Sequence, residues 1–446
     1  MLIGYFTEQP YRGVTEEQVL RHGSYFGISN SNFDRQLGAD LYNEYLDEFC
    51  YAEDLGFDAV CLNEHHGNPF CMSACLNISA AMLAKATETV KLVLIGNPLP
   101  AHHNPLRVAE ELAQIDLVSR GRVVAGWVRG SGPEQFFNNS NPAINRELFE
   151  EAHDFIIQAW TRPGPWRYEG KHFHYRHVNP WALPYQQPHP PTLIPGVLSL
   201  ETVEWAADRN YPYLGLGTSL APTAELWDIY ADRVASRGYQ AGPENFGYLG
   251  MVAVGDTEEE AVEMARNFLF AKGNGLFARA EHTLPAGFNS ASAIKRLSSN
   301  ASGGWLGLNR DKIMGEDHGK ADLSPEELLK IRGEIDIALE KMRENYQIIA
   351  GTPEQVKARI ETILRVARPG HFVFMNVQGD VEAQRRRKNM RLISEHVIPH
   401  MRQLSEELGL SSQFEVKPGS RRLAPGQARI QTTFPELLPA QKAKAA

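Results

Sequence analysis

Three consecutive titratable residues, Glu64, His65 and His66, stand directly after a short run of apolar and β-branched residues at 59–62. This run predicts a buried strand that presents a carboxylate and two imidazoles at its carboxyl end. Because a histidine side chain has an unperturbed pKa of about 6.5, His65 could give or take a proton at neutral pH. The alternative is that both histidines only satisfy hydrogen bonds at the end of a strand.

Two further stretches carry residues that suit an anion. Arg129 follows the apolar run 122–128 and precedes a glycine, so its planar guanidinium could reach a phosphate with little obstruction. Ser199 and Thr202 lie at the start of a predicted helix, where unpaired N–H groups and the helix dipole favour anions. Together they could form a phosphate cradle. The alternatives are a surface ion pair for Arg129 and simple helix capping by Ser199.

Asn97 and Pro98 end a third apolar run, and 101–105 continues it with two histidines and a second proline. The prolines favour defined turns and could hold a non-trans peptide bond beside a flat ligand. Turn formation alone would also explain them.

These stretches all follow apolar runs and precede helical patterns, which predicts parallel βα units. The expected strands cover 2–7, 57–62, 91–98, 122–130, 192–196, 213–217, 246–254 and 371–376. A doubly wound sheet has the same alternation. A (β/α)8 barrel with insertions is preferred, because polar residues follow strand after strand without a nucleotide fingerprint. The carboxyl ends of all barrel strands meet at one face, where such folds carry their chemistry.

The barrel is expected to cover 1–410, with rim insertions at about 8–38 and 270–345. An irregular excursion at 162–191 is rich in Trp, Pro and His, and 323–349 reads as an additional helix. The final stretch, 411–446, predicts a mobile tail or a surface arm.

Composition narrows the class of protein. The 446 residues are 43% hydrophobic and 22% charged, without an apolar run long enough to span a bilayer. The net charge of −9 does not favour nucleic acid, and the basic run 385–388 reads as a solvated helix face. The N-terminus lacks a signal-peptide pattern, which indicates a cytoplasmic protein. The four cysteines match no disulfide framework or common zinc spacing, so we expect no metal site.

Several common catalytic motifs are absent from the sequence. No Gly-x-Gly-x-x-Gly follows a predicted strand, and neither a P-loop nor a Gly-x-Ser-x-Gly elbow occurs. A nicotinamide cofactor bound in a Rossmann half is therefore not expected.

The ordered set of motifs resembles the bacterial luciferase-like family of flavin-dependent monooxygenases. The segments that carry this resemblance are 64–66, 122–130, 168–173, 199–205 and 351–354. The resemblance implies a (β/α)8 barrel, usually dimeric, that binds FMN at its carboxyl face.

Matched position by position, His65 falls where this family keeps its catalytic histidine. The positions that match phosphate-binding residues are Arg129, Ser199 and Thr202, and Asn97 falls near the flavin ring. Two positions depart from the family pattern. Val128 replaces the reactive cysteine of luciferase itself, which argues against light emission, and Leu198 replaces an acidic residue beside the phosphate-binding serine.

The resemblance further implies that reduced FMN reacts with O2 to a C4a-peroxide, which transfers one oxygen atom to a small organic substrate. In this reading His65 accepts or returns a proton, and Glu64 or His66 orients it. A separate NAD(P)H-dependent flavin reductase would supply the reduced FMN, and the oxygenase would be a homodimer.

Aromatic residues near the predicted rim suit an apolar substrate, which slightly favours aldehyde or ketone oxidation over hydroxylation, although core packing explains several of them equally well. They are Tyr5, Phe6, Phe26, Phe70, Trp127, Phe136 and Phe137.

Three other functions remain open. The same barrel could use the deazaflavin F420 for hydride transfer. A metal-dependent hydrolase could use His65, His66, His102 or His103 as ligands. The third is a flavin-binding barrel without catalytic activity.

Overall fold

Eight parallel strands close into a barrel in the computed structural model, which describes residues 1–15, 18–19, 28–130, 132–272, 324–379 and 381–439. Each strand pairs with the next barrel strand along the chain, and the last one pairs with the first. The barrel strands are β1 (Leu2–Phe6), β2 (Ala59–Leu62), β3 (Lys91–Leu94), β5 (Val123–Val128), β8 (Thr192–Gly196), β9 (Tyr213–Leu216), β10 (Phe246–Val254) and β12 (His371–Met375). The predicted (β/α)8 barrel is confirmed.

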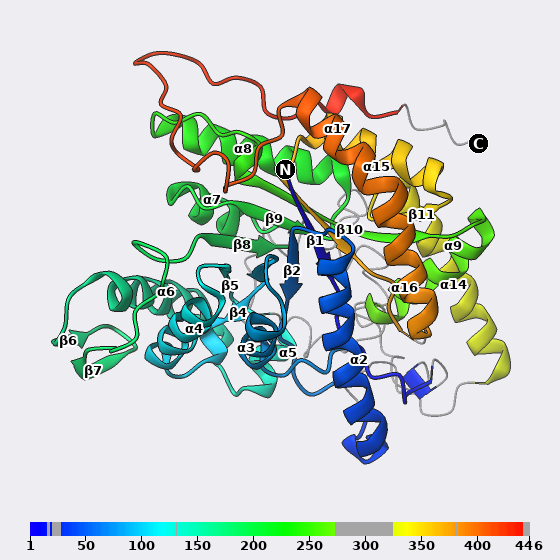
Figure 1. Ribbon diagram of the computed structural model, residues 1–446, viewed down its shortest axis with the longest axis horizontal. Coiled ribbons are helices and arrows are strands. Elements are labelled where there is room, and N and C mark those ends of the chain that lie inside the picture. The colour runs from blue at the N-terminus through cyan, green and yellow to red at the C-terminus, as the bar shows by residue number, and fades with distance from the viewer. Residues whose placement is uncertain (16–17, 20–27, 131, 273–323, 380, 440–446) are drawn as a thin grey trace.

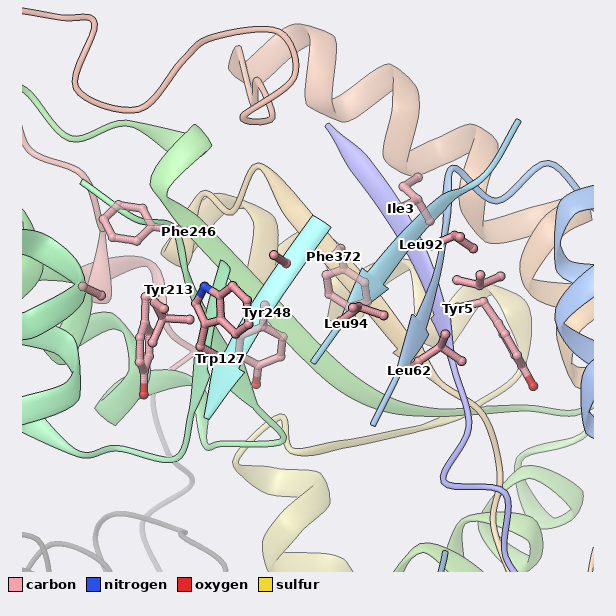
Figure 2. Packing of buried hydrophobic residues seen from close by; sticks show 14 of the residues in the cluster. Ile3, Tyr5, Leu62, Leu92, Leu94, Trp127, Tyr213, Phe246, Tyr248 and Phe372 are labelled. Carbon is pink, nitrogen blue, oxygen red and sulfur yellow. The ribbon is translucent and has the colours of Figure 1, made fainter. Parts of the chain in front are cut away.

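Alternate residues of each strand face opposite sides of the sheet, as the strand repeat requires. Tyr5 of β1 and Trp127 of β5 belong to one buried cluster (Figure 2). The same cluster also contains residues of the surrounding helices. Phe6 and Cys61 belong to a second cluster, built largely from the other faces of the strands, which fills the barrel. Apolar side chains on both faces explain why the strands read as continuous apolar runs.

Helices follow the strands and surround the barrel (Figure 1). Side chains cap the starts of some of them: Asp34 accepts a hydrogen bond from the Leu37 N–H at 2.9 Å, and the Gln355 side chain accepts one from the Thr352 N–H at 2.8 Å. The longer helices are α2 (Arg35–Asp54), α3 (Leu76–Ala86), α4 (Pro105–Ser119), α6 (Asn145–Thr161), α7 (Leu200–Asp208), α8 (Leu220–Ser236), α9 (Glu258–Lys272), α14 (Pro325–Glu344), α15 (Pro353–Ala367), α16 (Ala383–Leu392) and α17 (Ile398–Leu408).

Short elements depart from the predicted pattern. The excursion at 162–191 contains an antiparallel hairpin, β6 (Trp166–Glu169) with β7 (His174–Val178). The additional helix expected to 349 ends at Glu344, and β11 (Ile348–Gly351) then pairs with β10. A short helix, α5 (Gly132–Phe137), follows β5 and was not predicted. Most of the predicted insertion at 270–345 lies outside the described residues.

The basic run on α16 is not simply a solvated face, because Arg386 is 1% exposed. Its guanidinium pairs with Glu48 of α2 at 2.9 Å and also with Glu44, and Glu48 in turn accepts a hydrogen bond from the Tyr5 hydroxyl. A guanidinium can be buried here because two carboxylates compensate its charge. The prediction for this position was therefore wrong.

The described part of the C-terminal stretch, 411–439, runs over the amino end of the barrel. The backbone N–H of Gln413 donates to Nε2 of His371, the first residue of β12, at 3.2 Å. Further along, the hydroxyl of Thr433, which is fully buried, donates to Asp228 of α8 at 2.7 Å. Across the described residues, each helix is too short or too polar to cross a membrane.

Candidate active site

The predicted site residues follow four strands that are neighbours in the barrel. His65 follows β2, Asn97 lies in β4 (Asn97–Pro98) after β3, Arg129 follows β5, and Ser199 follows β8. Because these strands are parallel and adjacent, their carboxyl ends lie next to one another on one face of the barrel. The fold therefore groups the candidate residues at the expected end.

His65 lies between two buried carboxylates. Its Nδ1 is 2.6 Å from Oε1 of Glu134 on α5, and its Nε2 is 3.6 Å from Oε2 of Glu8, which follows β1. Burial opposes protonation of the imidazole, but the charges of Glu134 and Glu8 outweigh burial and raise the pKa of His65 to about 9. The ring of Phe70 lies 5.3 Å from the imidazole, centroid to centroid, and forms an apolar wall beside it.

Glu64 contacts other histidines. Its Oε1 lies 3.1 Å from Nε2 of His66 and 3.4 Å from Nε2 of His102, and its Oε2 accepts from the backbone N–H of Leu76 at the start of α3. Burial opposes ionisation, but the contacts with His102 and His66 lower the pKa of Glu64 to about 2. The contacts that orient His65 are those of Glu134 and Glu8, so the expectation that Glu64 or His66 orients it is not met.

Asn97 has an unusual environment for a buried amide. It is 0% exposed, yet neither its side-chain oxygen nor its side-chain nitrogen has a hydrogen-bond partner among the described residues. Native structures rarely leave such groups unpaired, so this amide indicates a place for a ligand. The non-trans peptide bond expected near Pro98 lies instead between Ile95 and Gly96.

Arg129 is a half-buried cation, and the described residues provide no carboxylate within ion-pair distance of its guanidinium. Burial and the nearby positive charge of Arg146 lower the pKa of Arg129 to about 10, which still leaves it charged at neutral pH. The alternative of a surface ion pair is therefore not supported, and an incoming anion could supply the missing partner.

The N-terminus of α7 is similarly open. Ser199 precedes the helix but its hydroxyl does not cap the backbone N–H groups of the first turn. Thr202 donates instead to the Ser199 hydroxyl at 3.1 Å, and Ser199 donates to Glu201 at 3.3 Å. The Thr202 N–H already donates to the Ser199 carbonyl at 3.2 Å, so the Leu200 N–H, which has no acceptor among the described residues, is the backbone donor that α7 offers to an anion.

These groups fit a ligand that carries a phosphate at one end and a flat polar ring system at the other. Arg129, Ser199, Thr202 and the first turn of α7 offer donors and positive charge for a phosphate. Asn97 offers an amide donor and acceptor for ring atoms. An FMN molecule has both parts. No group of three or more His, Cys, Asp or Glu side chains able to hold a metal ion occurs in the described part of the chain.

Sequence reasoning missed Glu134 and Glu8. Glu8 stands two residues after β1, so it had the same signal as the other candidates, a polar residue at a strand end. Glu134 lies on α5, five residues beyond Arg129, and no periodic pattern identified this short helix.

The rim aromatics were predicted with mixed success. Tyr5 and Trp127 face the outer side of the barrel, where Trp127 packs 6.1 Å from Trp160 of α6, centroid to centroid, so both belong to the core. Phe136 and Phe137 of α5 are 56% and 40% exposed and lie beyond the strand ends. Phe26 is outside the described residues.

Comparison with known proteins agrees with the family resemblance found in the sequence. The family model described as luciferase-like monooxygenase matches residues 26–368. The uncharacterized protein y4wF of Sinorhizobium fredii is 31% identical over 234 residues, which cover 51% of this chain and 67% of that protein. The alkanal monooxygenase alpha chain of Photobacterium leiognathi is 26% identical over 249 residues, covering 54% of this chain and 69% of the relative.

Solved structures share the fold at low sequence identity. A monooxygenase from Streptomyces bottropensis superposes with a TM-score of 0.60 at 20% identity, covering 90% of this chain and 100% of that one. The oxygenating constituent of 3,6-diketocamphane monooxygenase of Pseudomonas putida, in complex with FMN, gives 0.60 at 17% identity, covering 90% and 98%. An F420-dependent secondary alcohol dehydrogenase gives 0.58 at 16% identity, also covering 90% and 98%.

Proposed function

Because this chain belongs to the luciferase-like monooxygenase family, we propose that it is an FMN-dependent monooxygenase that uses O2 to oxygenate a small, apolar organic substrate. The observation that carries the proposal is the set of unpaired groups at adjacent strand ends. Among the described residues, the Arg129 guanidinium has no carboxylate within ion-pair distance and the Asn97 amide has no hydrogen-bond partner. His65 lies on the neighbouring strand end with its own pair of carboxylates.

The chain's own residues would divide the work. Arg129, Ser199 and Thr202 would hold the phosphate, and Asn97 would meet the polar edge of the ring system. When bound, reduced FMN supplies the electrons with which O2 is activated. His65 would hold and move a proton at its imidazole, which is 20% exposed at the side chain, and Phe70 would limit water beside it. We propose aldehyde or ketone oxidation as the reaction, with hydroxylation as the other outcome of a product analysis.

The phosphate cradle can be tested by comparing FMN with riboflavin, which lacks the phosphate. Replacing Arg129 with Gln removes a charged donor, so FMN affinity should fall about 10- to 100-fold while riboflavin affinity stays unchanged. Fluorescence titration measures both constants. Arg167→Gln is a matched control, because Arg167 is 68% exposed on the β6 strand. Equal losses for FMN and riboflavin, or no loss at all, would reject the cradle.

Oxygen uptake separates the two cofactor hypotheses. With chemically reduced FMN and a panel of aldehydes and ketones, the protein should incorporate one oxygen atom of 18O2 into the product. The alternative is hydride transfer with F420, which the structural likeness to an F420-dependent dehydrogenase favours. In that case F420 would bind in preference to FMN and be reduced by substrate without oxygen uptake.

We also propose that reduced FMN comes from a separate reductase, because the sequence lacks a dinucleotide-binding fingerprint. NADPH and FMN alone should then give no turnover, and an added NAD(P)H-dependent flavin reductase should restore it. The homodimer that the family resemblance implies would show in sedimentation as twice the mass of one chain.

A further inference from the structure

We propose that His65 enters the reaction as an imidazolium cation, with Glu134 as the positioning residue that keeps it protonated, so that its first act is to donate a proton. This inference rests on the proposed monooxygenase function and deepens it. The family resemblance left the direction of proton transfer open, and the contacts of His65 decide it.

Both ring nitrogens of His65 face carboxylate oxygens. Nδ1 is 2.6 Å from Glu134 and Nε2 is 3.6 Å from Glu8, and these two side chains are only 3% and 6% exposed. A neutral imidazole carries one N–H and one bare nitrogen lone pair. The bare nitrogen would then point its lone pair at a buried carboxylate, whereas the doubly protonated ring offers an N–H to each.

The charges around the ring favour the same state. The charged groups with the largest effect on His65 are all acidic: Glu134 from α5, Glu8 after β1, and Glu64 from its own segment. Glu64 is already engaged by His66 and His102, so Glu134 and Glu8 act most directly. Cys71 also lies near these carboxylates, but burial raises the pKa of its thiol well above the ordinary value and keeps it neutral.

The geometry also selects which proton moves. The Nδ1–H is held by the short contact to Glu134, whereas the contact of Nε2 to Glu8 is longer and weaker. We expect the Nε2–H to pass to an oxygen atom that gains negative charge during the reaction. The N–H bond breaks, an O–H bond forms, and a neutral imidazole remains with Nδ1–H still on Glu134. Solvent then returns a proton to Nε2, so the imidazolium is regenerated and the proton on the new O–H bond comes in net from solvent.

Proton titration of the histidines tests this without any cofactor. In the full-length protein labelled with 13C,15N-histidine, His65 is assigned by its loss in His65→Gln, and its ring signals are followed from pH 5 to 10. His65 in the unmodified protein should still be protonated at pH 7.5. In Glu134→Gln the midpoint should fall by about one to two pH units, because an opposite charge at this range shifts a pKa by that amount.

Two controls keep the result specific. Glu134→Asp preserves the charge and should recover part of the shift, which a purely structural role for Glu134 would not explain. Glu64→Gln should move the signals of His66 and His102 more than that of His65. A His65 midpoint near its unperturbed value in the unmodified protein, or an unchanged midpoint in Glu134→Gln, would overturn the proposal.

A second experiment measures the pH dependence of oxygenation with reduced FMN. As the pH rises, the kcat of Glu134→Gln should fall at a lower pH than the kcat of the unmodified protein does. The affinity for FMN should stay the same. If the titration behaves as expected but no oxygenation occurs with any cofactor, then the proposed function fails and the protonation of His65 stands. If oxygenation occurs and the alkaline limb does not move, the role of His65 as proton donor fails alone.

Discussion

Asn97 is the buried residue of the candidate site whose side chain we expect a ligand to pair with. Its amide is fully buried without a partner among the described residues, and such a group lowers the free energy of unfolding by about 1–3 kcal/mol. Asn97→Leu should therefore raise the melting temperature of the cofactor-free protein and weaken FMN binding. Calorimetry and fluorescence titration measure the two effects. Stability would be exchanged for function at this position, as expected for a binding site.

The same substitution at Asn389 is the matched control. That buried side chain donates to Val252 O at 3.1 Å and accepts from the Val254 N–H at 2.6 Å, so Asn389→Leu should lower the melting temperature. If both leucine variants lose stability equally, then Asn97 has partners in solution and no longer indicates a ligand.

His65 makes stability depend on pH in a direction that its neighbours set. Its folded pKa is raised above the unfolded value to about 9, so the folded state binds the proton more tightly. The stabilisation is fully present below about pH 6.5, the unfolded pKa. It is lost as the pH rises through about 9. The melting temperature of the unmodified protein should therefore exceed that of His65→Gln by more at pH 6 than at pH 9.5. A difference that is constant or grows over this range would contradict the paired imidazolium.

At the scale of helices, α2 and α16 are joined by a buried ion pair. Arg386 and Glu48 are almost fully buried, so removing the cation leaves a carboxylate without compensation. Arg386→Met should lower the free energy of unfolding by about 3–5 kcal/mol. Urea denaturation followed by circular dichroism measures it. Arg387→Met, one position along the same helix at an exposed site, should stay within about 0.5 kcal/mol of the unmodified protein. Similar losses in both variants would mean that the pair contributes little.

Long periodic elements could be predicted from the sequence, and short ones could not. The sequence at 145–161 predicts a helix, because its apolar positions repeat with helical spacing over four turns, and α6 has these bounds. β11 was missed because its four apolar residues fit the end of a helix as well as a strand, and only pairing with β10 decides between them. The burial of Arg386 depends on a partner 338 positions away, which no local pattern reveals.

The same limit applies to the candidate site. The barrel rule correctly placed His65, Asn97, Arg129 and Ser199 at neighbouring strand ends, because parallel order alone implies that arrangement. It could not show that His65 pairs with Glu134, 69 positions away, since that contact requires the chain to turn back through α5. Whether the grouped residues bind FMN remains a prediction.

At the scale of the whole molecule, the candidate site and the contacts that hold the C-terminal segment lie at opposite ends of the barrel. The candidate site lies at the carboxyl ends of the strands, and the segment 411–439 covers the amino ends. There, burial lowers the pKa of His371 to about 4, so its neutral Nε2 can accept the hydrogen bond from Gln413. The N-terminal amino group lies 3.4 Å from Glu415 of the same segment. Changes at this end should affect stability and leave flavin binding intact.

Asp228 of α8 provides the test of that separation. It accepts from Thr433 at 2.7 Å and from Thr432 at 3.3 Å, and pairs with Arg429 at 3.4 Å, so it anchors the segment through three side chains. Asp228→Ala should release the segment, lower the melting temperature, and speed tryptic cleavage within 421–429, while FMN affinity stays unchanged. Asp232→Ala is the control, because Asp232 is 69% exposed and contacts only Arg429 among the described residues. Loss of FMN binding in Asp228→Ala, at a melting temperature that still leaves the protein folded, would show that the two ends are coupled.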